Sequence, residues 1–140
     1  SYLESKTFLP GKKIKSFKLP WGKIGLSICY DLRFPNLYRK LAKQGSIFMS
    51  IPSAFTETTG KRHWHSLLKA RAIENFSYIF APAQGGRHYN GRETFGHSLI
   101  ISPDGKILKE LKKKEGIITA LIDPKMPNKL RSIIPSLKSD

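Results

Sequence analysis

Residues 21–35, WGKIGLSICYDLRFP, decide how this 140-residue chain folds, because they place its single cysteine, Cys29, where an apolar strand should end. Residues 23–28 alternate in polarity and carry two isoleucines and a leucine, which is typical of a half-buried strand. Residues 36–44 carry two leucines four positions apart and are followed by a glycine, the pattern of a helix with its stop signal. The sequence therefore predicts a strand, a tight corner and a helix, with Cys29 at the corner.

A cysteine in this position has two interpretations. A lone cysteine after an apolar run is most often a small buried side chain without a chemical task. Near a helix N-terminus, however, the helix dipole and the free N–H groups favour the thiolate, which is the nucleophilic form. The segment after Cys29 also brings Asp31 and Arg33 to the sheet edge where ligands bind in α/β proteins, and this favours the nucleophile.

The rest of the chain repeats the alternation of strands and helices, so we expect one α/β domain over residues 1–140. Further strands are predicted over 14–19, 46–51, 78–82, 98–102, 106–110 and 116–122, and a second helix over 64–75. An Asp-Gly turn at 104–105 predicts a hairpin between two of these strands. Loops are expected over 53–62 and 85–94, and a basic C-terminal arm over 124–140.

The composition narrows the class of protein. A net charge of +15 raises the possibility of a basic nucleic-acid-binding protein, but the lysines and arginines are scattered and no aromatic residues are interleaved with them. Nucleic acid is therefore not the expected partner. No apolar run is long enough for a membrane span, and one free cysteine suits a reducing compartment, so we expect a cytoplasmic protein that does not bind membranes.

Residues 25–35 resemble the nucleophile segment of the nitrilase (carbon–nitrogen hydrolase) superfamily, in its nitrilase-like amidase branch. Other segments resemble blocks of the same family in the same order: 52–55, 59–60, 63–64, 70–75, 83–84 and 96–98. The blocks at 83–88 and 96–98 resemble the deaminated-glutathione amidase subgroup more than the omega-amidase subgroup. Two positions depart from the family pattern, because His65 stands where many members carry glutamate and residues 102–105 replace an Asp-Pro-Trp-Gly turn.

The resemblance implies part of an α-β-β-α sandwich and hydrolysis of a small carboxylate-bearing amide through a cysteine thioester, without a metal or organic cofactor. Cys29 would be the nucleophile and the backbone N–H of Tyr30 an oxyanion donor. The substrate pocket would be lined by Arg33, Ser53, Ala54, Phe55, Gln84 and Gly85. The loops around Arg87 and Arg92 would suit the carboxylate of the substrate.

The same resemblance implies that this chain lacks the N-terminal portion of the domain. Aligned on Cys29, the family's catalytic glutamate and lysine lie upstream of Ser1, and Glu4, Lys6 and Lys12 do not match their motifs. We therefore expect the chain to be inactive alone and to need a missing N-terminal half or partner chain, in what would be a homo-oligomer in the intact family.

Three alternatives remain open from the sequence. One of the four histidines, His63, His65, His88 or His97, could serve as a base for Cys29. Arg71 and Glu74 could pair with Asp31 or Arg33 and brace the corner, or form a solvated charged face. The chain could also be a non-catalytic remnant in which the cysteine is structural.

Overall fold

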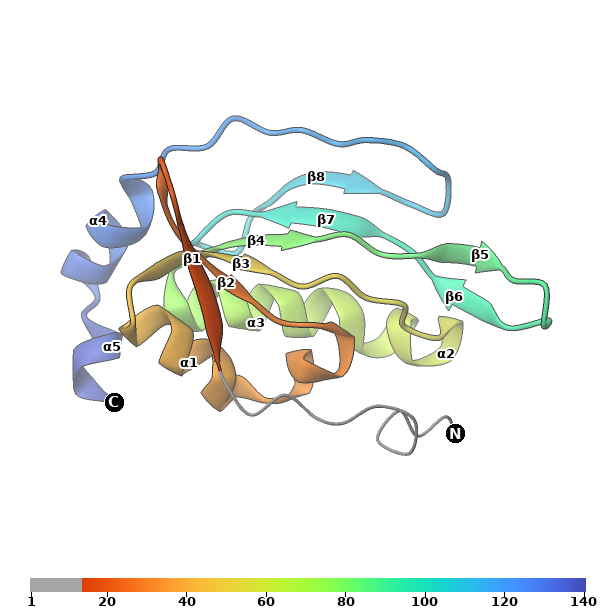
Figure 1. Ribbon diagram of the computed structural model, residues 1–140, viewed down its shortest axis with the longest axis horizontal. Helices are drawn as coiled ribbons and strands as arrows, with labels where there is room; N and C mark the ends of the chain where they lie inside the picture. The colour runs from red at the N-terminus through yellow and green to blue at the C-terminus, as the bar shows by residue number, and fades with distance from the viewer. Residues whose placement is uncertain (1–13) are drawn as a thin grey trace.

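A six-stranded mixed sheet is the centre of the computed structural model, which describes residues 14–140 (Figure 1). Its strand order is β1-β2-β3-β4-β7-β8. The strands are β1 (Lys15–Leu19), β2 (Gly22–Leu26), β3 (Ser46–Ser50), β4 (Tyr78–Ala81), β7 (Ser98–Ile101) and β8 (Ile107–Leu111). The central pairs β2·β3 and β3·β4 are parallel, whereas β1·β2, β4·β7 and β7·β8 are antiparallel. The hairpin predicted at the Asp-Gly turn is thus confirmed as the pair β7·β8.

Two helices connect the parallel strands, as the apolar spacing predicted. Helix α1 (Pro35–Lys43) joins β2 to β3, and α3 (His65–Asn75) joins β3 to β4. Both helices lie on the same side of the sheet (Figure 1), and their buried sides enclose the main core with the sheet. The largest fully buried side chains of this core are Leu32, Tyr38, Leu41, Met49, Ile51, Trp64, Leu68, Ile79, Leu99 and Ile101.

Two segments predicted as loops contain regular structure. The first includes a short helix α2 (Glu57–Thr59) and a π-helical turn (Gly60–Trp64) that runs directly into α3. The second contains an antiparallel hairpin of β5 (Gly85–Arg87) and β6 (Glu93–Phe95), which extends beyond the main sheet (Figure 1). Few apolar residues alternate in these segments, so the periodicity of the sequence did not reveal them.

The predicted strand over residues 116–122 is wrong, because no strand forms there. This segment runs back along the sheet toward α4 (Figure 1). Side chains still alternate as in a strand: Ile117 and Leu121 are 92% and 99% exposed, whereas Ile122 packs against Phe48 and Tyr78 on the sheet face opposite the helices. The alternation therefore results from side chains that pack on the sheet face, and not from hydrogen bonding to a neighbouring strand.

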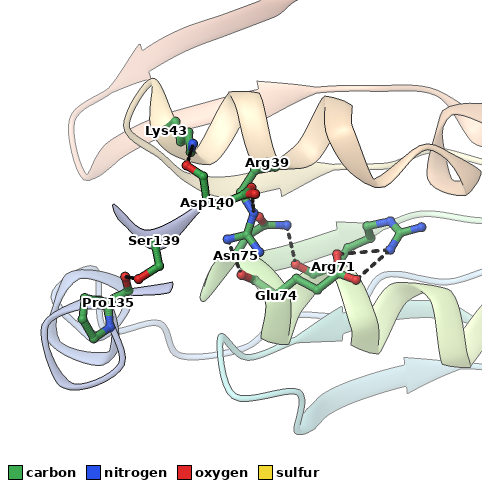
Figure 2. A network of polar contacts seen from close by, with 8 residues as sticks. All are labelled: Arg39, Lys43, Arg71, Glu74, Asn75, Pro135, Ser139 and Asp140. Carbon is green, nitrogen blue, oxygen red and sulfur yellow. Dashed lines mark hydrogen bonds and ion pairs between the residues drawn. The ribbon is translucent and has the colours of Figure 1, made fainter. Parts of the chain in front are cut away.

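The segment expected as a basic arm forms two helices, α4 (Met126–Ile133) and α5 (Ser136–Ser139). Figure 2 shows how the end of the chain is held: the Asp140 carboxylate pairs with Arg39 at 3.1 Å, and its backbone oxygen accepts a hydrogen bond from Lys43. Arg39 also donates to the Glu74 carbonyl at 2.7 Å, which links α1 to α3. The C-terminal segment is therefore attached to the helical layer.

The predicted α/β class is confirmed. Residues 14–140 provide a central six-stranded sheet with α1 and α3 on one face (Figure 1), which is the composition of half of an α-β-β-α sandwich. None of the helices within these residues is both long and apolar enough to cross a bilayer.

Candidate active site

Cys29 lies at the predicted corner, three residues after the end of β2. It is the first residue of a 3-10 helix (Cys29–Arg33), and α1 begins only at Pro35, so the α-helix N-terminus is further from the thiol than the sequence predicted. The backbone of Cys29 has a φ of 44°, in the left-handed region that residues other than glycine rarely adopt. Such a conformation costs about 1–2 kcal/mol and is found disproportionately at functional sites. The side chain is half-buried.

Hydrogen bonds on both sides of Cys29 hold this strained conformation. The Cys29 N–H donates to the Pro52 carbonyl at 2.9 Å, which joins the corner to the segment after β3. One residue earlier, the Ile28 N–H donates to the Asp31 carboxylate at 2.9 Å and closes the turn around the cysteine. The corner is thus fixed by its own backbone and by a neighbouring loop.

Arg71 of α3 braces the same corner from the helical layer. Its Nε and Nη2 donate to the Leu32 carbonyl at 3.0 and 2.9 Å, and its Nη1 pairs with Glu74 at 3.2 Å. Arg71 is 5% exposed and Leu32 is fully buried, so the two bonds to the Leu32 carbonyl are shielded from water. Of the two alternatives left open by the sequence, the structure has the brace, but its partner is a backbone carbonyl and neither Asp31 nor Arg33.

The Tyr30 N–H follows the thiol directly along the chain. Within residues 14–140 it donates no hydrogen bond, since the 3-10 helix begins only one residue earlier. A donor directly after the thiol is correctly positioned in the chain to stabilise an oxyanion. Its predicted role as oxyanion donor remains a prediction.

The two segments predicted to line the pocket meet beside the corner. Ser53 pairs with Ala83 in a parallel bridge, and the Gln84 N–H donates to the Ser53 carbonyl at 3.0 Å. The Phe55 carbonyl accepts from the Phe95 N–H at 2.8 Å, which attaches the first segment to β6. Since Pro52 binds the Cys29 N–H, these segments are connected to the cysteine through a single hydrogen bond.

Arg33 connects the corner to the same segments. Its guanidinium lies over the Phe55 ring, 5.2 Å from the centroid, and its Nη2 is 3.3 Å from His63 Nδ1. A guanidinium over an aromatic face is held by cation–π attraction. Arg33 is therefore oriented toward the predicted pocket wall.

An open cavity of about 220 Å³ lies among these segments. Of the six predicted pocket residues, Ala54 and Gln84 line it, whereas Arg33, Ser53, Phe55 and Gly85 do not, and Cys29 is not among its lining residues. The remaining lining residues come from the β5–β6 hairpin. Arg92 was predicted to suit the substrate carboxylate, whereas His88, Tyr89, Asn90 and Thr94 were not predicted as pocket residues. The signal for them was the polar run at 85–94, which was interpreted as a loop.

The two arginines of this hairpin differ in their surroundings. Arg87 pairs with Glu93 at 3.0 Å on the exposed side of the hairpin. Arg92 lines the cavity and forms no ion pair with any residue in 14–140. Arg92 is therefore the better-placed cation for an anionic ligand in this cavity.

The structure does not support a Cys–His pair. Each histidine has another partner: His63 contacts Arg33, His88 is 2.8 Å from the Thr94 hydroxyl, and none is hydrogen-bonded to Cys29 in the described part of the chain. His65 Nε2 and His97 Nδ1 both contact Glu110 Oε2, at 2.8 and 2.6 Å. Burial alone would raise the pKa of Glu110, but the two histidine hydrogen bonds outweigh it and hold the pKa below its ordinary value. This second cluster was not predicted, because its members come from three segments far apart in the sequence.

A strained cysteine at a strand-to-helix corner, beside loops that follow parallel strands, defines an α/β protein with a candidate nucleophile site. Comparison with known proteins agrees with this class. A model of the carbon-nitrogen hydrolase family matches residues 1–131. A deaminated glutathione amidase of Synechocystis sp. (strain PCC 6803 / GT-S) is 48% identical over 140 residues, which are 99% of this chain and 52% of that protein.

Solved structures extend the similarity to the fold. The C. elegans NitFhit protein is 39% identical with a TM-score of 0.94, over 99% of this chain and 34% of that one. An amidase mutant from Nesterenkonia sp. AN1 is 29% identical with a TM-score of 0.72, over 81% and 43% of the two chains. That amidase carries the acetamide moiety of fluoroacetamide added covalently to its active-site cysteine.

The chain belongs to the carbon-nitrogen hydrolase family, in the nitrilase superfamily. The family resemblance of the sequence is thus confirmed. The chain spans about half the length of the curated amidase that it matches at 48% identity.

Proposed function

We propose that this chain supplies the nucleophilic half of a carbon–nitrogen hydrolase, with Cys29 as the nucleophile. The observation that carries this proposal is the left-handed backbone of Cys29, φ 44°, held between the Pro52 carbonyl and the Asp31 turn. Local strain of this kind persists only where the surrounding structure fixes it. Covalent modification of the active-site cysteine in the Nesterenkonia amidase supports the same assignment.

In the proposed reaction the Cys29 sulfur attacks the amide carbonyl and forms a tetrahedral intermediate. The Tyr30 N–H donates to the oxyanion that develops on the carbonyl oxygen. The C–N bond then breaks, the amine leaves with a proton, and an acyl thioester remains on Cys29. Water cleaves the thioester and releases a carboxylic acid, which restores the thiol.

The proposed substrate is a small amide that carries a carboxylate. Arg92 in the cavity would bind the carboxylate, and Gln84 would contribute a polar contact in the same wall. The similarity to deaminated glutathione amidase makes deaminated glutathione the first compound to test. The remaining pocket residues, Arg33, Ser53, Ala54, Phe55 and Gly85, would shape the wall through the contacts described above.

The general base and the oxyanion lysine of the family would come from polypeptide that matches the N-terminal half of the relatives. The family resemblance implies that the motifs for both residues lie upstream of Ser1, and Glu4, Lys6 and Lys12 lie outside the residues that the structure describes. A thiol without these two groups loses most of the rate acceleration. We therefore propose that the 140-residue chain hydrolyses amides only when that half is present, in a cytoplasmic and homo-oligomeric enzyme.

Complementation tests this proposal. The chain is co-expressed with the N-terminal half of the Synechocystis relative, which is 48% identical over the shared part. Amine release from deaminated glutathione and from simple primary amides is followed by mass spectrometry, with Cys29→Ser as the control. We expect turnover by the complemented chain, none by the chain alone, and none by the complemented Cys29→Ser variant. Turnover that persists in Cys29→Ser would contradict the proposal.

A further inference from the structure

A second group of chemically active side chains comes from three segments of the described chain. His65 is the first residue of α3, His97 directly precedes β7, and Glu110 belongs to β8. The Glu110 Oε2 atom is 2.8 Å from His65 Nε2 and 2.6 Å from His97 Nδ1, and one donor atom from each residue lies within 4.8 Å of the others. None of these residues has a role in the proposed hydrolysis.

We propose that His65, His97 and Glu110 form a binding site for a divalent transition-metal ion such as Zn²⁺. Two imidazole nitrogens and one carboxylate oxygen are a ligand set that zinc sites use, with water as a fourth ligand. Ligands of a tetrahedral Zn²⁺ are roughly 3.3 Å apart, so the Glu110 oxygen would have to move away from His65 Nε2 by about 0.5 Å and from His97 Nδ1 by about 0.7 Å to admit the ion. Each neutral imidazole would then carry its proton on the ring nitrogen that faces away from the metal.

The imidazoles are held in place before any ion binds. The His97 ring stacks on Phe95 at a centroid distance of 4.0 Å, and the His65 ring meets the same Phe95 edge-to-face at 5.8 Å. The His97 backbone is fixed as well, because its carbonyl accepts from Trp64 Nε1 at 2.8 Å and its N–H donates to the Lys112 carbonyl at 2.9 Å. Supported ligands of this kind lose little freedom on binding, which favours affinity.

The three side chains are partly exposed, with 31%, 18% and 27% of their surfaces accessible for His65, His97 and Glu110. An ion and its water ligand can therefore reach the site. The net charge of +15 repels a cation at long range, so binding must come from the chelating side chains. A bound ion would link the N-terminus of α3 to β7 and β8, and so stabilise the fold.

The binding experiment uses the 140-residue chain with Cys29→Ser, because a thiolate is itself a strong ligand for zinc. Co²⁺ and Zn²⁺ are added separately, with the visible absorption of Co²⁺ and calorimetry with Zn²⁺ as readouts. We expect one equivalent of each metal to bind, tetrahedral Co²⁺ absorption, and a higher Tm with Zn²⁺. Glu110→Gln and His97→Gln should weaken binding at least about 100-fold, whereas the matched control His88→Gln should leave it unchanged.

If a variant fails to fold, imidazole NMR of the Cys29→Ser chain identifies the histidines that bind the metal without further substitutions. Zn²⁺ should shift the ring ¹⁵N signals of His65 and His97 and leave those of His63 and His88 in place. No stoichiometric binding, equal binding by Glu110→Gln and His88→Gln, or shifts confined to His63 and His88 would each overturn the proposal.

Discussion

Arg71 donates two hydrogen bonds from its guanidinium to the backbone carbonyl of Leu32, three residues after Cys29. This contact joins the middle of α3 to the 3-10 helix that begins at the cysteine. Because both residues are buried, the contact fixes the corner more firmly than an exposed ion pair would. The position of the thiol therefore depends on a helix that follows it by more than thirty residues.

Replacement of Arg71 by lysine tests this brace. An ammonium cannot reproduce the two-pronged guanidinium contact, so Arg71→Lys should lower the free energy of unfolding by about 2 kcal/mol. It should also change the rate at which Cys29 is alkylated, because the corner is less fixed. Urea unfolding and alkylation kinetics measure the two effects. The control Arg62→Lys changes an exposed arginine just before α3 and should alter neither; equal effects of the two variants would show that Arg71 does not act as a brace.

The left-handed backbone at Cys29 predicts that glycine at this position gives a more stable protein than alanine. Glycine adopts this conformation without penalty, so Cys29→Gly should be more stable than Cys29→Ala by about 1 kcal/mol. At Ser66, an exposed position within α3, alanine should be more stable than glycine by about 1 kcal/mol. Thermal unfolding of the four variants gives both differences, and the same sign at both positions would refute the strain at Cys29.

Arg131 should matter for stability although it lies in the C-terminal segment. Its guanidinium donates to the carbonyls of Ser46 and Asn75 and to the Ser77 hydroxyl, at 2.7, 3.0 and 3.0 Å. Burial, and to a smaller extent Arg39, lowers the pKa of Arg131 to about 10, which leaves it protonated at neutral pH. Arg131→Met should lower the free energy of unfolding by about 3 kcal/mol. Lys129→Met on the same helix is the control and should change it by less than about 0.5 kcal/mol.

The turn between β7 and β8 predicts a pH dependence. The Ser102 hydroxyl donates to Asp104, and this hydrogen bond, helped by the Lys106 N–H and opposed by burial, holds the pKa of Asp104 below its ordinary value. Because the folded pKa lies below the unfolded one, the stabilisation is present above about pH 4 and is lost as pH falls through the folded pKa. Urea unfolding is measured between about pH 2.5 and 6. The difference in the free energy of unfolding between the parent chain and Asp104→Asn should shrink toward low pH. Ser102→Ala should reduce the same pH dependence, and a constant difference across the range would contradict the assignment.

Periodicity in the sequence located most elements of the fold. The apolar alternation before Cys29 and the leucine spacing after it found β2 and α1 within one or two residues, because burial on one face determines both patterns. The β5–β6 hairpin has no such face, and its pairing depends on contacts with the loops after β3 and β4. No strand forms over 116–122, although its apolar residues alternate as in a strand. Its inward-facing side chains pack on the face of the sheet.

The candidate site was predictable only in part. The motif around Cys29 identified the thiol and its corner, and the two segments predicted to line the pocket are joined through Ser53, Ala83 and Gln84. The partner of Arg71 could not be predicted, because a backbone carbonyl is present at every position and has no signature in the sequence. The cluster of His65, His97 and Glu110 was missed since it depends on the relative placement of α3, β7 and β8.

Alkylation of Cys29 tests the central claim most directly, because it is the single cysteine of the chain. The folded 140-residue chain, the same chain in urea and the Cys29→Ser variant are treated with iodoacetamide, and peptide mass spectrometry follows the label over time. A reachable nucleophile predicts one label per folded chain, at a rate at least equal to that of the unfolded chain, and no label in Cys29→Ser. A folded chain that stays unlabelled until urea is added would show that the thiol is packed inside the protein, and the hydrolase proposal would fail.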